Sequence, residues 1–298
     1  MNIALWGGTG HIGRALQHTF SNRGFNCHSY VRDFEKAEKY LPYGGFSGFK
    51  QFPSRQYDIL INAIAAGPGH GRQLFKTLEK WDWRMIEFAK EHPKCSCVSI
   101  SSGAVYGNDF SRPADESSAF TLNPNQVEQS QLYGLIKFMC EQRHRAFYDL
   151  PLVDLRLFAF FTRHMDFEQP FFMSDVIKAV QNNEVLATQE LDFHRDFSHP
   201  EDLADLIYLC AEKKVNAGYD LYSKSPIKKS EILNAFEERY GLRHSCGEVW
   251  QSLTGSKGYY FSNNRKAAEI GYEPKFTSLD VLLDEADFIF KAGLYGQA

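Results

Sequence analysis

The sequence predicts an α/β fold in which a doubly wound parallel sheet is followed by a smaller C-terminal α/β lobe. Apolar runs at residues 3–6, 27–31, 59–64, 97–100 and 153–158 alternate with amphipathic segments. This alternation is typical of parallel strands joined by helices. Beyond about residue 162 it is less regular, and helices are expected at 174–181, 201–212, 230–240 and 278–291, separated by short strands and loops.

One helix of the first half shows its buried face in the sequence. Apolar side chains recur at spacings of four and three residues at Leu74, Leu78, Trp81, Met85 and Ala89. This spacing places them in one stripe that faces the core. Gly241 follows the helix expected at 230–240, in the place of a left-handed C-terminal cap.

Length and composition limit the classes of function. The 298 residues are 43% hydrophobic, enough for a large core, and the net charge of -4 disfavours nucleic acid or an anionic membrane as a partner. No apolar run is long enough to span a bilayer. A strand-like run and a glycine turn directly follow Met1, where a secretory leader would be apolar, so a cytoplasmic protein is expected. The six cysteines show no Cys-x-x-Cys spacing, which predicts reduced, buried thiols.

The first apolar run leads into a glycine-rich turn that is typical of dinucleotide binding. Glycines at this spacing permit a tight turn, close approach of a pyrophosphate, and close packing of helix on strand. The cofactor contacts expected in this turn are Gly7, Thr9, Gly10, His11, Ile12 and Gly13. Residues 1–161 are therefore expected to be an NAD(P)-binding Rossmann domain. Residues 162–298 are expected to be a substrate-binding lobe whose sheet and helix segments can interleave with it.

Three further residues suggest proton and hydride transfer at a carbonyl. Tyr133 and Lys137 are four residues apart and share one face of a helix, so the ammonium can reach the surroundings of the phenol and the cofactor ribose. A phenol is a weak acid at neutral pH, and a nearby cation favours its ionised form. Ser102, which follows the run at 97–100, can donate to a substrate carbonyl while Tyr133 transfers the proton. Taken alone, the Tyr–Lys pair is more typical of an ordinary helix, and Ser102 is what favours the catalytic interpretation.

Together these motifs resemble the extended short-chain dehydrogenase/reductase superfamily, in its nucleotide-sugar epimerase/reductase branch. The resemblance rests on G-x-x-G-x-x-G at 7–13, S-S-x-x-V-Y-G at 101–107, and Y-x-x-x-K continued into K-x-x-x-E at 133–141. It implies that Ser102, Tyr133 and Lys137 form the catalytic triad. It also implies that Tyr133 and Lys137, with Ala63 and Ile64 at the end of the run at 59–64, contact the cofactor.

The resemblance extends into the smaller lobe. Residues 195–204 are similar to the branch's R-D-F-x-H-V-x-D-L-A segment, in which the arginine binds the diphosphate of a nucleotide-diphosphate sugar. It implies that Arg195, together with Ser102, binds the substrate, and the planar fork of a guanidinium suits phosphate oxygens. A surface cluster of Arg195 with Asp196 is the alternative. Residues 266–274 resemble the branch's closing K-A-x-x-x-L-G-W-x-P stretch. The resemblance also allows a homodimer formed through a helix bundle that includes the Tyr133 helix.

Two departures from the branch pattern narrow the expected reaction. Dehydratases of the branch have Asp and Glu directly after the catalytic hydroxyl residue, as acid and base for water elimination, whereas this chain has Gly103 and Ala104. Reduction and epimerisation remain. The asparagine of the branch's L-R-x-x-N is replaced by Ala159, so a different placement of the substrate is expected.

The end of the second apolar run bears on the choice of cofactor. Branch members that use NAD have an acid at the last strand position, which here is Val31, and Arg32 follows it. An arginine beside the adenosine ribose pairs with a 2′-phosphate, so NADP(H) is favoured and NAD(H) is the alternative. In the competing interpretation, Asp33 binds the ribose, since it lies twenty residues after Gly13, and Arg32 faces solvent.

The sequence thus predicts an NADPH-dependent oxidoreductase that reduces a keto group on a nucleotide-diphosphate sugar. An epimerase with retained NAD and a non-catalytic NADP-sensing protein are the alternatives. No metal is expected, because His164, His194 and His199 lack the spacing of metal ligands. The glycine-rich segment at 67–72 is either a loop over the nicotinamide or a plain surface connection.

Overall fold

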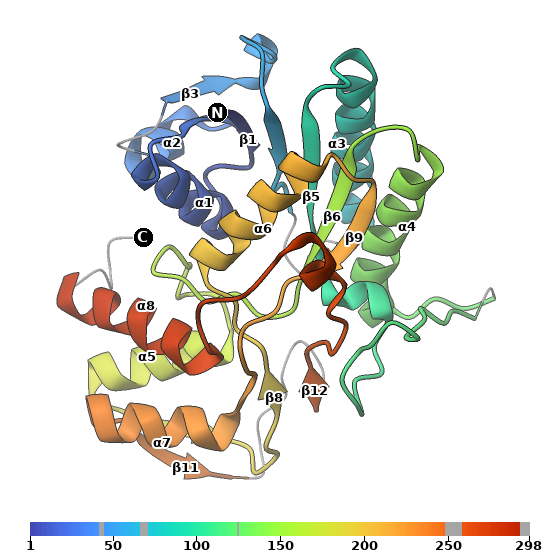
Figure 1. The fold of residues 1–298 in the computed structure, drawn as a ribbon. Coiled ribbons are helices and arrows are strands. Elements are labelled where there is room, and N and C mark those ends of the chain that lie inside the picture. The colour runs from blue at the N-terminus through green and yellow to red at the C-terminus, as the bar shows by residue number, and fades with distance from the viewer. Residues whose placement is uncertain (42–44, 66–70, 124, 248–257, 293–298) are drawn as a thin grey trace.

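The computed structural model describes residues 1–41, 45–65, 71–123, 125–247 and 258–292, and a seven-stranded sheet forms its centre (Figure 1). The strands run in the order β3-β2-β1-β4-β5-β6-β9, and every neighbouring pair is parallel. Their bounds are β1 Asn2–Trp6, β2 Asn26–Val31, β3 Gly45–Gly48, β4 Ile59–Asn62, β5 Ser96–Ser102, β6 Leu152–Leu157 and β9 Ala217–Asp220. The predicted doubly wound parallel sheet is confirmed.

Helices cover both faces of this sheet (Figure 1). On one face lie α1 (His11–Asn22) and α6 (Pro200–Lys213), and on the other α3 (Gly71–Glu91) and α4 (Leu132–Ala146). Alternate residues of β1 point into the two cores, with Ile3 on the α1 side and Ala4 on the α3 side. The apolar stripe predicted on α3 is buried along its whole length. A short helix, α2 (Phe34–Tyr40), follows β2.

Two elements beyond residue 162 belong to the main sheet and not to the smaller lobe. Leu203, Leu206 and Ile207 of α6 pack in the same core as β1 and β6, and β9 pairs with β6. The helix expected at 201–212 therefore exists, but its assignment to the smaller lobe was wrong. Periodicity shows which face of a helix is apolar, but it does not show which sheet will cover that face. The division near residue 161 otherwise remains a prediction.

The smaller lobe has its own core. It is built from α5 (Phe172–Asn182), α7 (Lys229–Tyr240) and α8 (Ser278–Ala292), whose apolar faces meet in one cluster. Two small sheets complete it, in the orders β10-β8-β12 and β11-β7. Their strands are β7 Val185–Thr188, β8 His194–Arg195, β10 Ile227–Lys228, β11 Arg243–Cys246 and β12 Tyr259–Tyr260. Gly241 caps α7 with a φ of 70°, as predicted.

Short 3-10 helices connect several of these elements. They are η1 Phe49–Gln51, η2 Gly103–Tyr106, η3 Gln129–Gln131 and η4 Lys266–Ile270. All six cysteines have free thiols, and five of them are buried, as expected, while Cys246 is exposed. Within the described ranges, no helix combines the length and the apolar character needed to cross a membrane.

Candidate active site

The turn after β1 forms a cradle for which glycine is required at two places. Gly7 has a φ of 83°, and a Cβ there would lie 2.8 Å from the carbonyl oxygen of Ala63. A Cβ at Gly13 would lie 2.2 Å from the carbonyl oxygen of Gly7, so α1 packs directly on the turn. No side chain caps α1 at Gly10, so the N–H groups of its first turn remain available to an anion. The cradle thus fits the pyrophosphate of a dinucleotide.

The end of β4 completes this cradle. The Ala63 N–H donates to the carbonyl oxygen of Trp6 at 2.9 Å, and the Ile64 N–H donates to Asn62 Oδ1 at 3.2 Å. β1 lies between β2 and β4, so the strand order reverses here. The chain leaves β1 toward one face of the sheet and β4 toward the other. Ala63 and Ile64 are therefore placed beside Gly7, at the position expected of cofactor contacts.

The residues that bear on cofactor choice follow β2. Arg32 is exposed at the end of the strand. Asp33 is the N-cap of α2, and its Oδ1 accepts from the Lys36 N–H at 3.0 Å. The structure thus gives the Asp33 carboxylate a capping role that the sequence analysis missed, although Asp33 three residues before Lys36 at the start of a helix could have indicated it.

Arg14 is a second residue that the sequence analysis missed at this edge. Its guanidinium lies over the Tyr40 ring at 4.0 Å from the centroid and donates to the carbonyl oxygen of His164 at 3.2 Å. Arg14 thereby joins α1 to the end of α2 and to the loop after β6. Its place directly after the last glycine of the turn was the available signal.

Ser102 ends β5 and begins η2. Its Oγ accepts from the Ala104 N–H at 3.2 Å and lies 3.2 Å from the hydroxyl oxygen of Tyr260. Only 8% of Ser102 is exposed. The Tyr260 contact is the one that sequence reasoning missed, because 158 residues separate the two side chains.

The other two predicted catalytic residues come from α4. A Cβ at Gly134 would lie 2.4 Å from the carbonyl oxygen of Ala104, so α4 packs closely on η2 and brings Tyr133 to the end of β5. Lys137 is buried, and its Nζ donates to the carbonyl oxygen of Ile100 at 2.7 Å. The structure therefore gathers Ser102, Tyr133 and Lys137 at the carboxyl end of β5, where open α/β sheets bind ligands.

A buried network of charges supports this end of the sheet. Glu141 accepts from Ser101 Oγ at 2.6 Å and from Arg156 Nη2 at 2.6 Å. Arg156 also donates to the Tyr106 hydroxyl at 2.7 Å, and this hydroxyl donates to Asp220 at 2.9 Å. The network ties α4, β5, β6 and β9 together behind Ser102. The Y-x-x-x-K-x-x-x-E and V-Y-G motifs therefore include structural members as well as the three predicted catalytic residues.

Arg195 lies on β8, opposite Tyr260 of β12 in the strand register. Its Nη1 donates to the carbonyl oxygen of His194 at 2.8 Å, and its guanidinium lies 4.5 Å from the centroid of the Phe193 ring. Burial lowers the pKa of Arg195 to about 10, against the opposing effect of Tyr260. The guanidinium is still charged at neutral pH. The alternative of a surface cluster with Asp196 is wrong, because Asp196 is buried and accepts from the Ser223 N–H at 3.0 Å.

The side chains that meet Gly103 explain how this chain departs from the dehydratase pattern. A Cβ at position 103 would lie 2.3 Å from two carbon atoms of the Phe158 ring. Phe158 is itself buried between Phe110 and Tyr260. An aromatic ring therefore fills the place beside Ser102 where a carboxylate would otherwise project.

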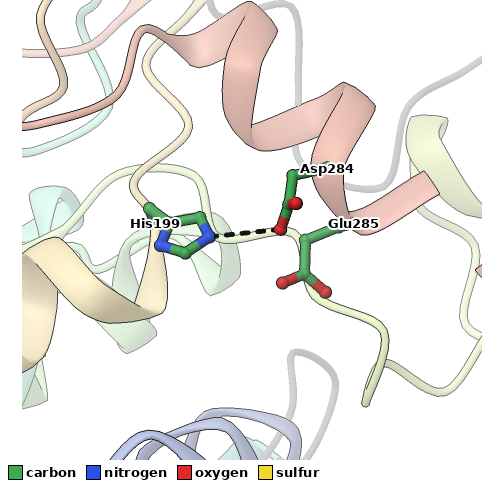
Figure 2. Close-up of side chains that lie close together, drawn as sticks. All are labelled: His199, Asp284 and Glu285. Carbon is green, nitrogen blue, oxygen red and sulfur yellow. Dashed lines mark hydrogen bonds and ion pairs between the residues drawn. The ribbon is translucent and has the colours of Figure 1, made fainter. Parts of the chain in front are cut away.

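His199, Asp284 and Glu285 lie close together between α6 and α8 (Figure 2), with ligand atoms within 4.8 Å of one another. Each of the three side chains already has a hydrogen-bond or ion-pair partner. Arg163 donates to Glu285 Oε2 through Nε at 2.8 Å and to Asp284 Oδ2 through Nη2 at 3.0 Å. His199 Nδ1 accepts from the Glu201 N–H at 3.1 Å, which leaves the proton on Nε2, facing Asp284 at 3.5 Å. The cluster is an ion-pair contact between the two lobes, in which Arg163 supplies the cation.

Comparison with known families settles the assignment that the fold and the glycine cradle suggest. The family model described as the NAD dependent epimerase/dehydratase family matches residues 3–222. The chain belongs to this family. The prediction of a short-chain dehydrogenase/reductase-type enzyme is thereby confirmed. A comparison with curated proteins found no match.

Solved structures of this epimerase/dehydratase type share the fold over nearly the whole chain. UDP-glucose-4-epimerase from Stenotrophomonas maltophila, with bound NAD and formylated UDP-arabinopyranose, has a TM-score of 0.81 at 17% identity and covers 98% of this chain and 99% of its own. UDP-N-acetylglucosamine 4-epimerase from Methanobrevibacter ruminantium M1, in complex with UDP-N-acetylmuramic acid, has 0.79 at 16%, covering 98% of each chain. dTDP-glucose 4,6-dehydratase from Bacillus anthracis, in complex with NAD, has 0.78 at 17%, covering 99% and 98%.

These likenesses confirm the fold predicted for a family member of this kind. The segment at 67–72 was expected to be either a loop over the nicotinamide or a plain surface connection. Its residues 67–70 lie outside the described part of the chain. The structure therefore leaves both interpretations as predictions.

Proposed function

We propose that the protein is a nucleotide-sugar epimerase that retains NAD(H), with Ser102, Tyr133 and Lys137 as its catalytic residues. The observation that carries this proposal is the gathering of these three residues at the carboxyl end of β5, beside a Gly103 that Phe158 covers. Without a carboxylate at position 103, water elimination lacks its acid. The names of two similar structures, both 4-epimerases, favour epimerisation over keto reduction.

The reacting atoms are a carbinol carbon of the sugar and its hydroxyl oxygen. Tyr133 takes the hydroxyl proton as its base, and Ser102 donates a hydrogen bond to the same oxygen as this becomes a carbonyl oxygen. A bound nicotinamide would supply the reversible acceptor for the carbon's hydrogen and electron pair. Tyr133 then gives the proton back to the oxygen. Proton and electron pair are thus restored, and no external oxidant or reductant is consumed.

Lys137 holds the proposed base in place. Its ammonium is fixed by the carbonyl oxygen of Ile100 at 2.7 Å, on the face of α4 that also carries Tyr133. A buried cation on this face of α4 suits proton transfer at the Tyr133 hydroxyl. Its remaining N–H donors suit the hydroxyl groups of the cofactor ribose.

We propose Arg195 as the ligand of the substrate diphosphate. It carries a half-buried charge on β8 and lies in register with Tyr260, which contacts Ser102. The diphosphate would thus be bound on β8, beside the strand whose Tyr260 contacts Ser102. A guanidinium can pair with two phosphate oxygens at once.

The experiment that tests the catalytic assignment uses Tyr133→Phe. This variant should keep its bound nucleotide and lose turnover, because it lacks the hydroxyl that moves the proton. Acid extraction of the purified proteins, followed by chromatography of the released nucleotide, measures the first property, and product analysis by NMR measures the second. Wild-type turnover in Tyr133→Phe contradicts the mechanism.

The choice between NAD and NADP can be tested with two substitutions after β2. For NAD we propose Asp33 as the ribose ligand, so Asp33→Asn should weaken NAD binding while Asn keeps the helix cap. Arg32→Ala should then leave binding nearly unchanged. NADPH-dependent keto reduction is the second candidate, favoured by the exposed Arg32 at the end of β2. Under that candidate Arg32→Ala abolishes a preference for NADPH, and turnover requires added NADPH.

We further propose a homodimer formed through α3 and α4. Trp83 and Met139 are exposed on these helices, by 41% and 40%, and the Arg143 guanidinium lies over the Trp83 ring at 4.7 Å. Light scattering of Trp83→Glu should show a monomer where the wild type is a dimer. Val185→Glu, at a 53% exposed site on β7, is the matched control and should stay dimeric. A dimeric Trp83→Glu protein contradicts this interface.

A further inference from the structure

The contact between Ser102 and Tyr260 joins the two lobes at the candidate catalytic site. The two hydroxyl oxygens lie 3.2 Å apart. Ser102 belongs to the central sheet, whereas Tyr260 belongs to β12 of the smaller lobe (Figure 1). Tyr260 therefore lies beside Ser102, the residue that is proposed to donate a hydrogen bond to the substrate oxygen.

Either hydroxyl can donate in this contact, and a count of donors and acceptors shows what each direction leaves for the substrate. A serine hydroxyl has one hydrogen to donate and two acceptor positions. The Ala104 N–H already uses one acceptor position at 3.2 Å. If Ser102 donated its hydrogen to Tyr260, none would be left for a substrate oxygen. If Tyr260 donates instead, both acceptor positions are filled, and the serine hydrogen must point toward a third group.

The surroundings of Tyr260 favour the donor role. Burial raises the pKa of the Tyr260 phenol to about 12, against the opposing effects of Ser102, Arg195 and the Ala104 amide, so the phenol keeps a proton that it can donate at neutral pH. Its ring packs edge-on against Phe110 at 4.7 Å and against Phe158 at 5.3 Å between centroids. Two donors on one oxygen also polarise its O–H bond, which strengthens the hydrogen bond that it donates.

We propose that Tyr260 is a positioning residue which, with the Ala104 amide, aims the Ser102 hydrogen at the reacting oxygen of the substrate. This inference rests on the proposed function of Ser102. Tyr260 would act through Ser102 and would not itself transfer a proton. Since Tyr260 and Arg195 are register partners on β12 and β8, the same strand pair would hold the diphosphate and set the serine.

A double-mutant cycle tests this role. Tyr260→Phe should lower kcat by roughly tenfold, the rate equivalent of one hydrogen bond, with KM within about twofold of the wild type. In the Ser102→Ala background the same substitution should change kcat by less than about twofold, because no serine is left to orient. Tyr259→Phe, next to it on β12 and 38% exposed, is the matched control and should be neutral. Independent, additive losses overturn the proposal, as does a wild-type kcat in Tyr260→Phe.

A second readout keeps this proposal separate from the proposed function. In a crystal structure of Tyr260→Phe, the Ser102 side chain should occupy more than one rotamer, because one of its two donors is gone. A single unchanged rotamer in that variant overturns the positioning role, whatever the reaction. A wild-type protein that turns over no nucleotide sugar overturns the proposed function, while the rotamer result still decides the role of Tyr260.

Discussion

The ring of Phe158 lies against the Cα of Gly103, so closely that a Cβ at position 103 would be 2.3 Å from two ring carbons. The neighbouring residue, Ser102, which we propose to be catalytic, has a hydroxyl that lies 3.2 Å from the hydroxyl oxygen of Tyr260. Where dehydratases of the branch have an acid, this chain therefore has a glycine covered by an aromatic ring. The proposed proton-transfer residues are still present. This difference is the structural basis for separating the proposed epimerase from a dehydratase.

Gly103→Ala should destabilise the protein by about 1–3 kcal/mol, the usual cost of overpacking a filled core. The buried Phe158 ring must move to admit the new methyl group. Denaturation by urea measures the loss. Gly103→Ala combined with Phe158→Leu should lose less than the sum of the two single substitutions, since the smaller side chain makes room. Equal stability of Gly103→Ala and wild type contradicts the packing described.

Glu141→Gln should destabilise the protein by about 3–5 kcal/mol, because it leaves the buried Arg156 without its main counter-charge. Its effect should reach the active site, since Glu141 also accepts from Ser101, next to Ser102. Thermal unfolding measures the loss. Glu87→Gln, which removes an exposed ion pair with Lys90, is the control and should be neutral. A neutral Glu141→Gln refutes the structural role of the network.

His144 predicts a loss of stability at alkaline pH. Its ring is buried between Asp154, at 2.9 Å, and Asp82, at 2.8 Å. Burial alone would lower the pKa, but the two carboxylates outweigh it and raise the pKa from 6.5 to about 10. The stabilisation is therefore complete below about pH 6.5 and is lost as the pH rises toward 10.

Unfolding free energies measured between these two pH values test this prediction. The wild type should lose stability across the interval, and His144→Gln should lose much less, since glutamine does not titrate. The variant should also be less stable at neutral pH, where it leaves two buried carboxylates with less positive charge. Parallel pH profiles for the two proteins contradict the assignment of a charged His144.

Arg163→Met should loosen the contact between α8 and the rest of the protein. It leaves the buried Glu285 uncompensated, at a cost of about 3–5 kcal/mol. Hydrogen exchange of the α8 amides should rise more than that of the central sheet. Because Arg163 already supplies the cation of this cluster, a chelator should leave the melting temperature of the wild type unchanged. A fall in melting temperature with the chelator points to a bound metal and contradicts the account of Figure 2.

Arg195→Met should raise KM for a nucleotide-diphosphate sugar by roughly tenfold to a hundredfold, the equivalent of losing charged hydrogen bonds to phosphate. NAD content should not change, because Arg195 lies on β8, away from the glycine cradle of β1. Arg195→Lys should have a KM between those of the wild type and Arg195→Met, since lysine keeps the charge and lacks the planar fork of the guanidinium. An unchanged KM in Arg195→Met removes it from the substrate site.

Periodicity and glycine chemistry allowed the sheet and the cofactor cradle to be predicted. The runs that became β1, β2, β4, β5 and β6 are buried on both faces, as strands covered by helices are. β3 and β9 escaped prediction because each has only four residues, with glycine or aspartate among them. That α6 packs on the main sheet was not predicted, because its sequence shows that one face is buried but not which element covers that face.

The candidate site likewise contains residues that local motifs predicted and contacts that only the fold creates. Ser102, Tyr133 and Lys137 belong to local motifs, so spacing and resemblance brought them together before the fold was known. The contacts of Tyr260 with Ser102 and of Phe158 with Gly103 join residues that are far apart in the sequence, so no local pattern predicts them. The sequence showed that a carboxylate was missing after Ser102, but only the structure shows what replaced it.

The most direct test of the proposed epimerase uses a panel of nucleotide-diphosphate sugars, each carrying deuterium on the carbinol carbon whose inversion is examined. Purified protein is incubated with each substrate, without added cofactor, and the products are analysed by NMR. For the sugar that is accepted, we expect the epimer to retain the deuterium on the inverted carbon, because the hydrogen leaves and returns within one bound cofactor. Exchange of the deuterium with solvent, or no reaction until NADPH and a keto sugar are supplied, would contradict the proposed epimerase.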